Sequence, residues 1–241
     1  YRRSNNFTIF WYVHHLFLLF FCGLLIHAKN FYLWFLGPGA LYMLERILRN
    51  VRGSSVTIVK QVSALSSNVV HLELEKPNFR YKSGQYCFVN CPLISSHEWH
   101  PFTISSAPEE EHLTFHIRCV GDWTGALKDL FVPTGKGTVV INKPTTPSGD
   151  SYLIRVDGPF GTAAEYVFDF EYVMLVAAGI GVTPYASLLK HMMYKLRQGK
   201  KMKIKRVYFF WINRDTGSWE WFSDLLDKLE DERSDFFEIH T

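Results

Sequence analysis

An apolar run near the beginning of the chain sets the strongest limit on what this sequence can fold into. Residues 7–27 read FTIFWYVHHLFLLFFCGLLIH, and the only strongly polar side chains among them belong to His14, His15 and His27. Because the hydrocarbon core of a bilayer is about 30 Å thick, a run of this length is predicted to cross a membrane as one helix. The run is too long for a signal peptide and lacks a cleavage site.

A second apolar stretch, residues 31–48, predicts a partner for this helix. It contains a glycine–proline–glycine interruption and ends among charged residues, namely Glu45, Arg46, Arg49 and Arg52. Its apolar part is short, so this span depends on arginine side chains that reach back to the membrane surface. Arg2 and Arg3 precede the first run and only Lys29 lies in the turn, which predicts a hairpin with both ends cytosolic. The alternative is a buried helical hairpin of a soluble domain.

Charge and cysteine content narrow the class of protein. The net charge is +3, and no stripe of basic residues alternates with aromatic residues, so nucleic acid is not an expected partner. The four cysteines form no C-x-x-C pair and are few for a disulfide scaffold, which predicts reduced thiols on the cytosolic side. The chain opens on Tyr1 rather than Met, so we expect a piece of a longer protein.

From residue 56 the sequence changes to short segments typical of β-strands. Turn-forming residues separate these segments, which are residues 56–59, 71–75, 85–89 and 112–118. Strands at short, regular spacing predict an antiparallel β-barrel, which we assign to residues 53–163. Residues 135–150 are rich in Gly, Pro, Thr and Ser, and we predict that they form a loop.

The texture changes again at residue 172. Residues 173–177 form a continuous apolar run, which predicts a buried parallel strand. A glycine-containing turn, a helix at 185–196, a second buried strand at 207–211 and a second helix at 219–229 are predicted to follow. Alternating strands and helices indicate a parallel α/β domain over residues 164–241.

Residues 100–106, HPFTISS, carry groups that suit a flavin. Phe102 offers an aromatic plane for stacking, and Thr103 offers a hydroxyl group for a hydrogen bond near the redox nitrogen. On the following strand Thr114, His116 and Arg118 share one face, which predicts a diphosphate site. An ordinary barrel strand explains the same pattern and stays open as an alternative.

The sequence GIGVTP begins at Gly179, in the position of a dinucleotide fingerprint between a strand and a helix. Gly179 and Gly181 let a pyrophosphate or nicotinamide approach the backbone, although proline replaces the third glycine. Thr183 as N-cap and Pro184 as first helical residue predict the helix start. A plain strand-to-helix turn is the alternative. Arg214, after the second strand, either meets the 2′-phosphate of NADPH or forms a surface ion pair.

His14 and His27 are candidate metal ligands, because an ionisable residue inside a membrane span is costly and commonly functional. They lie about 20 Å apart along a helix, which suits two stacked haem groups held by imidazole. The same spacing rotates a side chain by about 220°, so ligands on one face require an extra residue, as in a π-bulge. His15 is assigned a packing or hydrogen-bonding role. Satisfied core histidines are the alternative.

Taken together, these segments resemble the NADPH oxidase family, the superoxide-generating flavocytochromes. The matching motifs are FWYVHHLF at 10–17, EWHPFT at 98–103, HIR at 116–118, GDWT at 121–124, DGPFGT at 157–162 and GIGVTP at 179–184. They extend over nearly the whole chain, and their order is specific to the family.

The resemblance implies three parts and a set of contacts in each. Residues 1–52 would be a transmembrane helical hairpin, residues 53–163 a ferredoxin-reductase-like antiparallel β-barrel for FAD, and residues 164–241 an α/β domain for NADPH. His14 would ligate the inner and His27 the outer of two b haems. The implied FAD contacts are His100, Pro101, Phe102, Thr103, Ile104, Ser105, Ser106, His116, Arg118 and Thr124. The implied NADPH contacts are Gly179, Gly181, Thr183, Pro184 and Arg214.

The resemblance also implies a reaction and a setting. Electrons would pass from NADPH through FAD and both haems to molecular oxygen, which would yield superoxide. The expected location is a plasma membrane or endomembrane, in a lipid bilayer, with the flavin and nucleotide domains in the cytosol. The expected protein partners are cytosolic activators and a small membrane subunit.

The sequence departs from the family pattern at both ends. Four earlier transmembrane helices, which carry the partner histidines, and the second half of the nucleotide domain are expected in the family but absent from this sequence. We therefore expect this piece to be inactive alone and to retain FAD best of the three cofactors. A ferric-chelate reductase with the same relay, and a truncated, non-catalytic isoform that binds partner subunits, remain alternatives.

Overall fold

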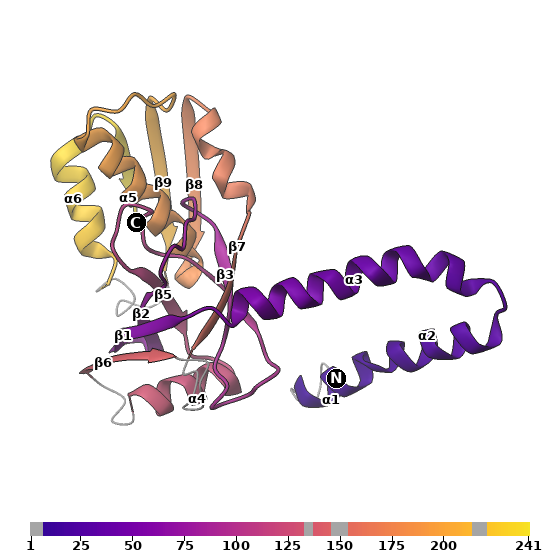
Figure 1. Cartoon of the computed structure of the whole chain (residues 1–241). Coiled ribbons are helices and arrows are strands. Elements are labelled where there is room, and N and C mark those ends of the chain that lie inside the picture. Colours follow the sequence, from indigo (N-terminus) through magenta and orange to yellow (C-terminus); the bar gives the residue numbers. More distant parts are fainter. Residues whose placement is uncertain (1–6, 133–136, 146–153, 214–220) are drawn as a thin grey trace. The chain divides into compact units, whose positions relative to one another are not determined.

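The computed structural model describes residues 7–132, 137–145, 154–213 and 221–241, and the chain divides into two compact units, residues 1–51 and 52–241. The first unit is built from helices α1 (Phe7–His14), α2 (Leu16–His27) and α3 (Phe31–Gly53), the last of which runs into the second unit (Figure 1). The ring of Phe21 in α2 lies 6.4 Å from that of Phe31 and 5.5 Å from that of Phe35 in α3. These aromatic contacts pack α2 against the beginning of α3.

One helical stretch among the described residues, Ile9–His27, is long and apolar enough to cross a membrane. None of its residues is buried, so most of its apolar surface is exposed in the described chain. Helix α3, whose second half carries Glu45, Arg46 and Arg49, does not reach the same apolar content. A crossing by both helices therefore stays a prediction.

The stretch Ile9–His27 is not a regular helix, because it is interrupted at His15. The His15 backbone N–H lies 3.2 Å from the carbonyl oxygens of both Trp11 and Tyr12, and the Leu18 N–H donates to the His15 carbonyl at 3.1 Å. Bonds to the third preceding residue tighten a helix, whereas a π-bulge widens it, so this interruption is not the π-bulge that ligands on one face would require. The His15 Nδ1–H donates to the Trp11 carbonyl at 2.7 Å, which confirms the predicted hydrogen-bonding role.

In the first part of the second unit, the described residues form seven antiparallel strands in two sheets, in the orders β5-β2-β1-β6 and β4-β3-β7. Their bounds are β1 Thr57–Leu65, β2 Val69–Glu75, β3 Tyr86–Asn90, β4 His100–Thr103, β5 Leu113–Arg118, β6 Gly137–Thr145 and β7 Arg155–Phe160. One apolar core joins both sheets to helix α4 (Asp122–Phe131). Short 3₁₀ helices lie at Ser66–Asn68 and Ala163–Asp169. The antiparallel prediction is confirmed, and a fully closed barrel stays a prediction.

Strand β6 lies where a loop was predicted. Its middle pairs with β1, with Val139 opposite Val62 and Thr138 opposite Ser63. The Ser63 and Thr138 hydroxyl groups also lie 3.0 Å apart. The run Thr-Val-Val-Ile favours a strand, and its partner β1 lies more than seventy residues away in sequence. The loop prediction was therefore wrong for residues 137–145, while residues 135–136 and 146–150 lie outside the described residues.

The second part of this unit is a parallel sheet in the order β10-β9-β8, as predicted for an α/β domain. The strands are β8 Tyr172–Ala178, β9 Arg206–Ile212 and β10 Phe237–His240, and they alternate with the 3₁₀ turn η3 Gly179–Val182 and helices α5 Thr183–Arg197 and α6 Ser223–Arg233. Buried side chains of β8 and β9 share one core with α5 and α6. The first two residues of the helix predicted at 219–229 lie outside the described residues.

Strand β8 is buried on one face only. Val173, Leu175 and Ala177 are buried, whereas Tyr172 and Met174 are 63% and 68% exposed. The prediction that the whole apolar run is buried was therefore wrong. A continuous apolar run suits a parallel strand covered on both faces, but here α5 and α6 share a core with one face only.

Candidate functional site

The first four residues of the heptad His100–Ser106 form strand β4. The His100 ring lies 4.4 Å from the ring of Trp123 in α4, and the Phe102 ring lies 6.0 Å from it. Because side chains alternate along a strand, Pro101 and Thr103 point to the other side. Pro101 is exposed and Thr103 half-buried, and the Thr103 hydroxyl has no hydrogen-bond partner among the described residues.

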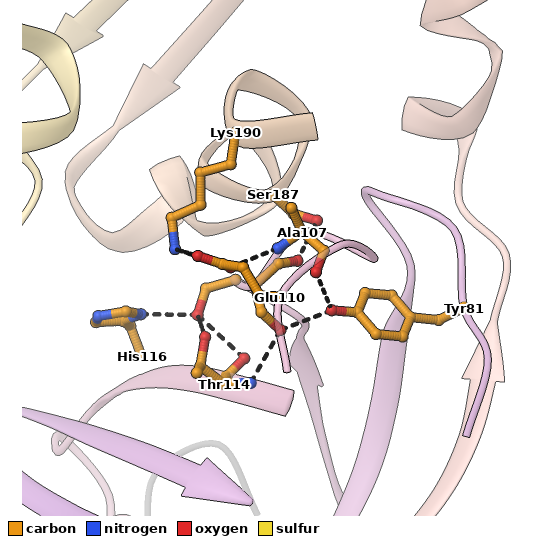
Figure 2. Close-up of polar contacts among 9 residues, drawn as sticks. Tyr81, Ala107, Glu110, Thr114, His116, Ser187 and Lys190 are labelled. Carbon is orange, nitrogen blue, oxygen red and sulfur yellow. Dashed lines mark hydrogen bonds and ion pairs between the residues drawn. The ribbon is translucent and has the colours of Figure 1, made fainter. Parts of the chain in front are cut away.

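The last three residues of the heptad, Ile104, Ser105 and Ser106, are fully buried. The Ser105 hydroxyl donates to the Thr114 carbonyl at 3.0 Å, and the Ser106 hydroxyl accepts from the Thr114 N–H at 3.0 Å. The Tyr81 hydroxyl lies 2.8 Å from the Ser106 hydroxyl (Figure 2). Both serine hydroxyls are therefore buried and already hydrogen-bonded within the protein.

His116 on β5 lies within this network. Its Nδ1 is 2.8 Å from the Ser105 hydroxyl oxygen, and its ring stacks on Trp221 with centroids 4.0 Å apart. Burial, together with neighbouring His71 and Lys190, holds the pKa of His116 well below its ordinary value. The imidazole is thus neutral near pH 7.

His71 and Trp221 were missed in the sequence. His71 lies opposite His116 in the β2–β5 register, and the two rings are 4.6 Å apart. Burial and nearby Lys190 lower the pKa of His71 to about 4, against an opposing effect of Glu110. The period-two pattern places a residue on a face, but it does not state which residue lies opposite it on the neighbouring strand.

Arg118 ends strand β5, and its side chain is exposed. A Cβ atom added to Gly179 would lie 3.9 Å from Nη1 of Arg118. The Arg118 guanidinium group, on the strand after the flavin motif, therefore lies beside the glycine turn of the α/β part. This approach places a permanent positive charge where both phosphate sites were predicted.

Thr124 lies in the first turn of α4 and caps that helix. Its hydroxyl donates to the Gly121 carbonyl and accepts from the Gly121 N–H, both at 3.1 Å. The adjacent Trp123 is buried, and its indole nitrogen has no hydrogen-bond partner among the described residues. The Trp123 N–H is therefore a further donor beside His100 that the sequence did not single out.

The glycine turn has the conformation that its residues allow. Gly179 has a φ of +52°, a region that L side chains rarely adopt, and nothing lies within 4 Å of a Cβ added to Gly181. The indole N–H of buried Trp211 donates to the Gly179 carbonyl at 3.0 Å. A buried tryptophan therefore bonds to the turn at Gly179, and the space beside Gly181 is open.

Thr183 is not the N-cap that was predicted. It is the first residue of α5, with φ −54° and ψ −43°, and no side-chain cap bond is present at this helix start. The reason is that the 3₁₀ turn η3 leads directly into α5, so no extended residue separates the two. Pro184 lies in the first turn, as predicted. Arg214 lies outside the described residues.

His14 and His27 are both exposed within the helical unit. The His14 ring lies 5.4 Å from the ring of Phe10 and 5.6 Å from that of Phe17. The described residues contain no group of three or more His, Cys, Asp or Glu that can hold a metal ion. The two histidines can each offer one imidazole to an iron, and a bis-histidine haem needs a second one.

The sequence matches two known domain families. Residues 54–164 match the FAD-binding domain family, and residues 170–241 match the ferric reductase NAD binding domain family. The second unit also resembles solved reductases. A ferredoxin NADP⁺ reductase from Neisseria gonorrhoeae, solved with FAD and NADP, aligns with 77% of this chain and 66% of its own at TM-score 0.55 and 17% identity. A Plasmodium falciparum ferredoxin–NADP⁺ reductase variant aligns with 77% and 69% at TM-score 0.57 and 19% identity.

Curated relatives match almost the whole chain. One superoxide-generating NADPH oxidase heavy chain of Dictyostelium discoideum is 46% identical over 99% of this chain and 48% of its own length. Human NADPH oxidase 3 is 36% identical over 99% of this chain and 48% of its own. The chain thus spans about half the length of the curated relatives it matches. With these identities and the reductase fold, the chain belongs to the NADPH oxidase family.

Proposed function

We propose that this chain carries electrons from NADPH to FAD within a superoxide-generating oxidase. The observation that supports this most directly is the approach of Arg118 to Gly179, which brings the flavin motif and the nucleotide turn together in one unit. The proposed parts are a membrane hairpin at 1–52, an FAD barrel at 53–163 and an NADPH domain at 164–241. The family matches at 54–164 and 170–241 support the last two.

The residues around β4 fit a flavin. Thr103 offers a half-buried hydroxyl that has no partner among the described residues, and Arg118 offers an exposed guanidinium group for a diphosphate. Bound FAD would supply the change from a two-electron donor to one-electron steps. We assign flavin contact to the exposed side of the heptad at Pro101 and Thr103, while His100 and Phe102 pack behind that side against Trp123. Ile104, Ser105 and Ser106 support this strand from the core, and neutral His116 is hydrogen-bonded to Ser105.

The glycine turn fits a nicotinamide dinucleotide. Gly181 leaves open space above the backbone, and Gly179 turns its carbonyl inward towards Trp211. Thr183 is buried directly after this turn, and Pro184 follows it on the helix. We assign NADPH contact to Gly179, Gly181, Thr183 and Pro184, with Arg214 as a candidate for the 2′-phosphate.

We further propose that His14 and His27 each donate one axial ligand to a b haem in the whole protein. Their exposed side chains suit ligation by a group from outside the described helices. In this arrangement the first unit lies in the bilayer, of a plasma membrane or endomembrane, with the remaining unit in the cytosol and molecular oxygen as final acceptor. The whole protein would bind cytosolic activators and a small membrane subunit.

The test is to express the natural full-length protein in membranes and add NADPH. We expect cytochrome c reduction that superoxide dismutase blocks. The match of residues 170–241 to a ferric reductase family makes a ferric-chelate reductase the second candidate. NADPH-dependent iron reduction without superoxide would support that candidate, and a protein without haem or flavin would support a non-catalytic isoform.

A further inference from the structure

Helix α5 carries a row of polar side chains that bond to residues outside the α/β part. Lys190 and His191 lie three and four residues after Ser187, so both are neighbours of Ser187 on one side of the helix. Thr183, one turn before Ser187, begins the same face directly after the glycine turn. The row therefore continues from the proposed nucleotide site along a single rigid helix.

Ser187 bonds to the last residue of the flavin heptad, and Lys190 and His191 bond to the loop that follows the heptad. The fully buried Ser187 hydroxyl donates to the Ser106 carbonyl at 2.6 Å. The Lys190 ammonium lies 3.1 Å and 3.2 Å from the two carboxylate oxygens of Glu110 (Figure 2). His191 Nδ1 lies 2.7 Å from a carboxylate oxygen of Glu109.

The loop is itself rigid where the row meets it. Glu110 accepts the Ala107 N–H at 2.7 Å, and the Tyr81 hydroxyl donates to the Ala107 carbonyl at 2.8 Å. Lys190 and Glu110 are each about three-quarters buried, with 26% and 27% side-chain exposure, so solvent screens this ion pair less than a surface pair. The Lys190–Glu110 ion pair thus joins helix α5 to a loop that has hydrogen bonds of its own.

We propose that Ser187, Lys190 and His191 are positioning residues that hold the glycine turn in register with the flavin motif. This inference rests on the proposed transfer from NADPH to FAD. Transfer between two bound groups needs close, fixed placement, and a displacement of about 1 Å can cost 10²-fold in rate. The α5 latch, defined as these three residues with Ser106, Glu109 and Glu110, fixes that placement without touching either ligand.

The kinetic test uses the full-length protein with FAD bound, mixed with NADPH without oxygen. Lys190→Met should lower the rate of flavin reduction at saturating NADPH roughly tenfold, while the NADPH concentration for half-maximal rate and the flavin content stay unchanged. Lys190→Arg should keep the wild-type rate. The control is Arg197→Met on the same helix, because the Arg197–Glu232 ion pair lies wholly within the α/β part. It should change the rate less than twofold.

A second readout does not depend on turnover. In flavin-free protein, Lys190→Met and Ser187→Ala should each speed amide hydrogen exchange in residues 104–112, and Arg197→Met should not. If wild-type flavin is reduced but Lys190→Met and Ser187→Ala match Arg197→Met in both readouts, the latch is overturned. Loss of flavin from either variant would also overturn it, because the contact would then build the flavin site. Failure of NADPH to reduce wild-type flavin would instead refute the proposed function.

Discussion

The flavin motif and the glycine turn are built by different means. In the heptad, the Ser105 and Ser106 hydroxyls are fully buried and hydrogen-bonded to the next strand. In the turn, Gly179 and Gly181 contribute only backbone, and the Trp211 indole N–H bonds to the Gly179 carbonyl. Side-chain substitutions in the motif should therefore damage the fold first, whereas substitutions in the turn should damage nucleotide binding first.

The sharpest test of this contrast compares two hydroxyl groups of the heptad. Ser105→Ala should lower the free energy of unfolding by about 2 kcal/mol, because it removes the partner of buried His116 Nδ1. Thr103→Val removes a hydroxyl that has no partner in the described part of the chain, and it should change stability by less than about 0.5 kcal/mol while lowering flavin affinity. Denaturant unfolding and flavin content measure both effects. Equal stability of the two variants would break the contrast.

The turn offers the converse test. Gly179→Ala should raise the NADPH concentration for half-maximal flavin reduction roughly tenfold, since a positive φ costs an L residue about 1–2 kcal/mol. Gly181→Ala should also weaken NADPH binding but leave the thermal midpoint unchanged, because its Cβ meets open space. Gly199→Ala is the control for strain, since Gly199 has a φ of +64° outside the site. A Gly199 variant with the same NADPH defect would contradict the assignment.

Acid should lower the free energy of unfolding through His71 on β2. The pKa of His71 is about 4 in the folded chain against an ordinary value of 6.5, so the unfolded chain binds more protons between these values. Stability is therefore complete above pH 6.5 and falls as the pH drops towards 4. His71→Asn should flatten this slope, and His240→Asn, at an exposed position, should not. Unfolding free energies measured across this range give the slopes, and identical slopes for all three proteins would refute the prediction.

The smallest expected effect concerns the side-chain bond from Trp211 to the turn. Trp211→Phe removes the indole donor to the Gly179 carbonyl and should cost about 1 kcal/mol. We expect the half-saturating NADPH concentration to rise a few-fold. Phe209→Leu, a buried neighbour on β9 that makes no such bond, should lower the thermal midpoint without that rise. A parallel rise in both variants would show that the effect is packing alone.

Local patterns in the sequence predicted the elements but not their partners. Alternation and apolar runs located β5, β8 and β9, and GIGVTP located the turn, because these signals depend on neighbouring residues. Strand β6 was missed since its strand character depends on pairing with the distant β1. The exposed face of β8 was missed because an apolar run does not state which faces are covered.

The candidate site was predictable to the same degree. The heptad and the glycines were predicted from motifs. The sequence did not show that the Ser105 and Ser106 hydroxyls are buried and hydrogen-bonded to Thr114. His71 and Trp221 escaped because their role arises from cross-strand and inter-element stacking with His116. The α5 latch joins residues about eighty positions apart, and only the folded chain brings them together.

The central claim is that the flavin motif and the glycine turn form one electron-transfer site. The most direct measurement mixes the full-length, flavin-loaded protein with NADPH in the absence of oxygen and follows the flavin absorbance. Our account predicts that NADPH bleaches the flavin in the wild type, and that Gly181→Ala bleaches it only at higher NADPH concentration. Flavin that stays oxidised in the wild type at saturating NADPH would contradict the account.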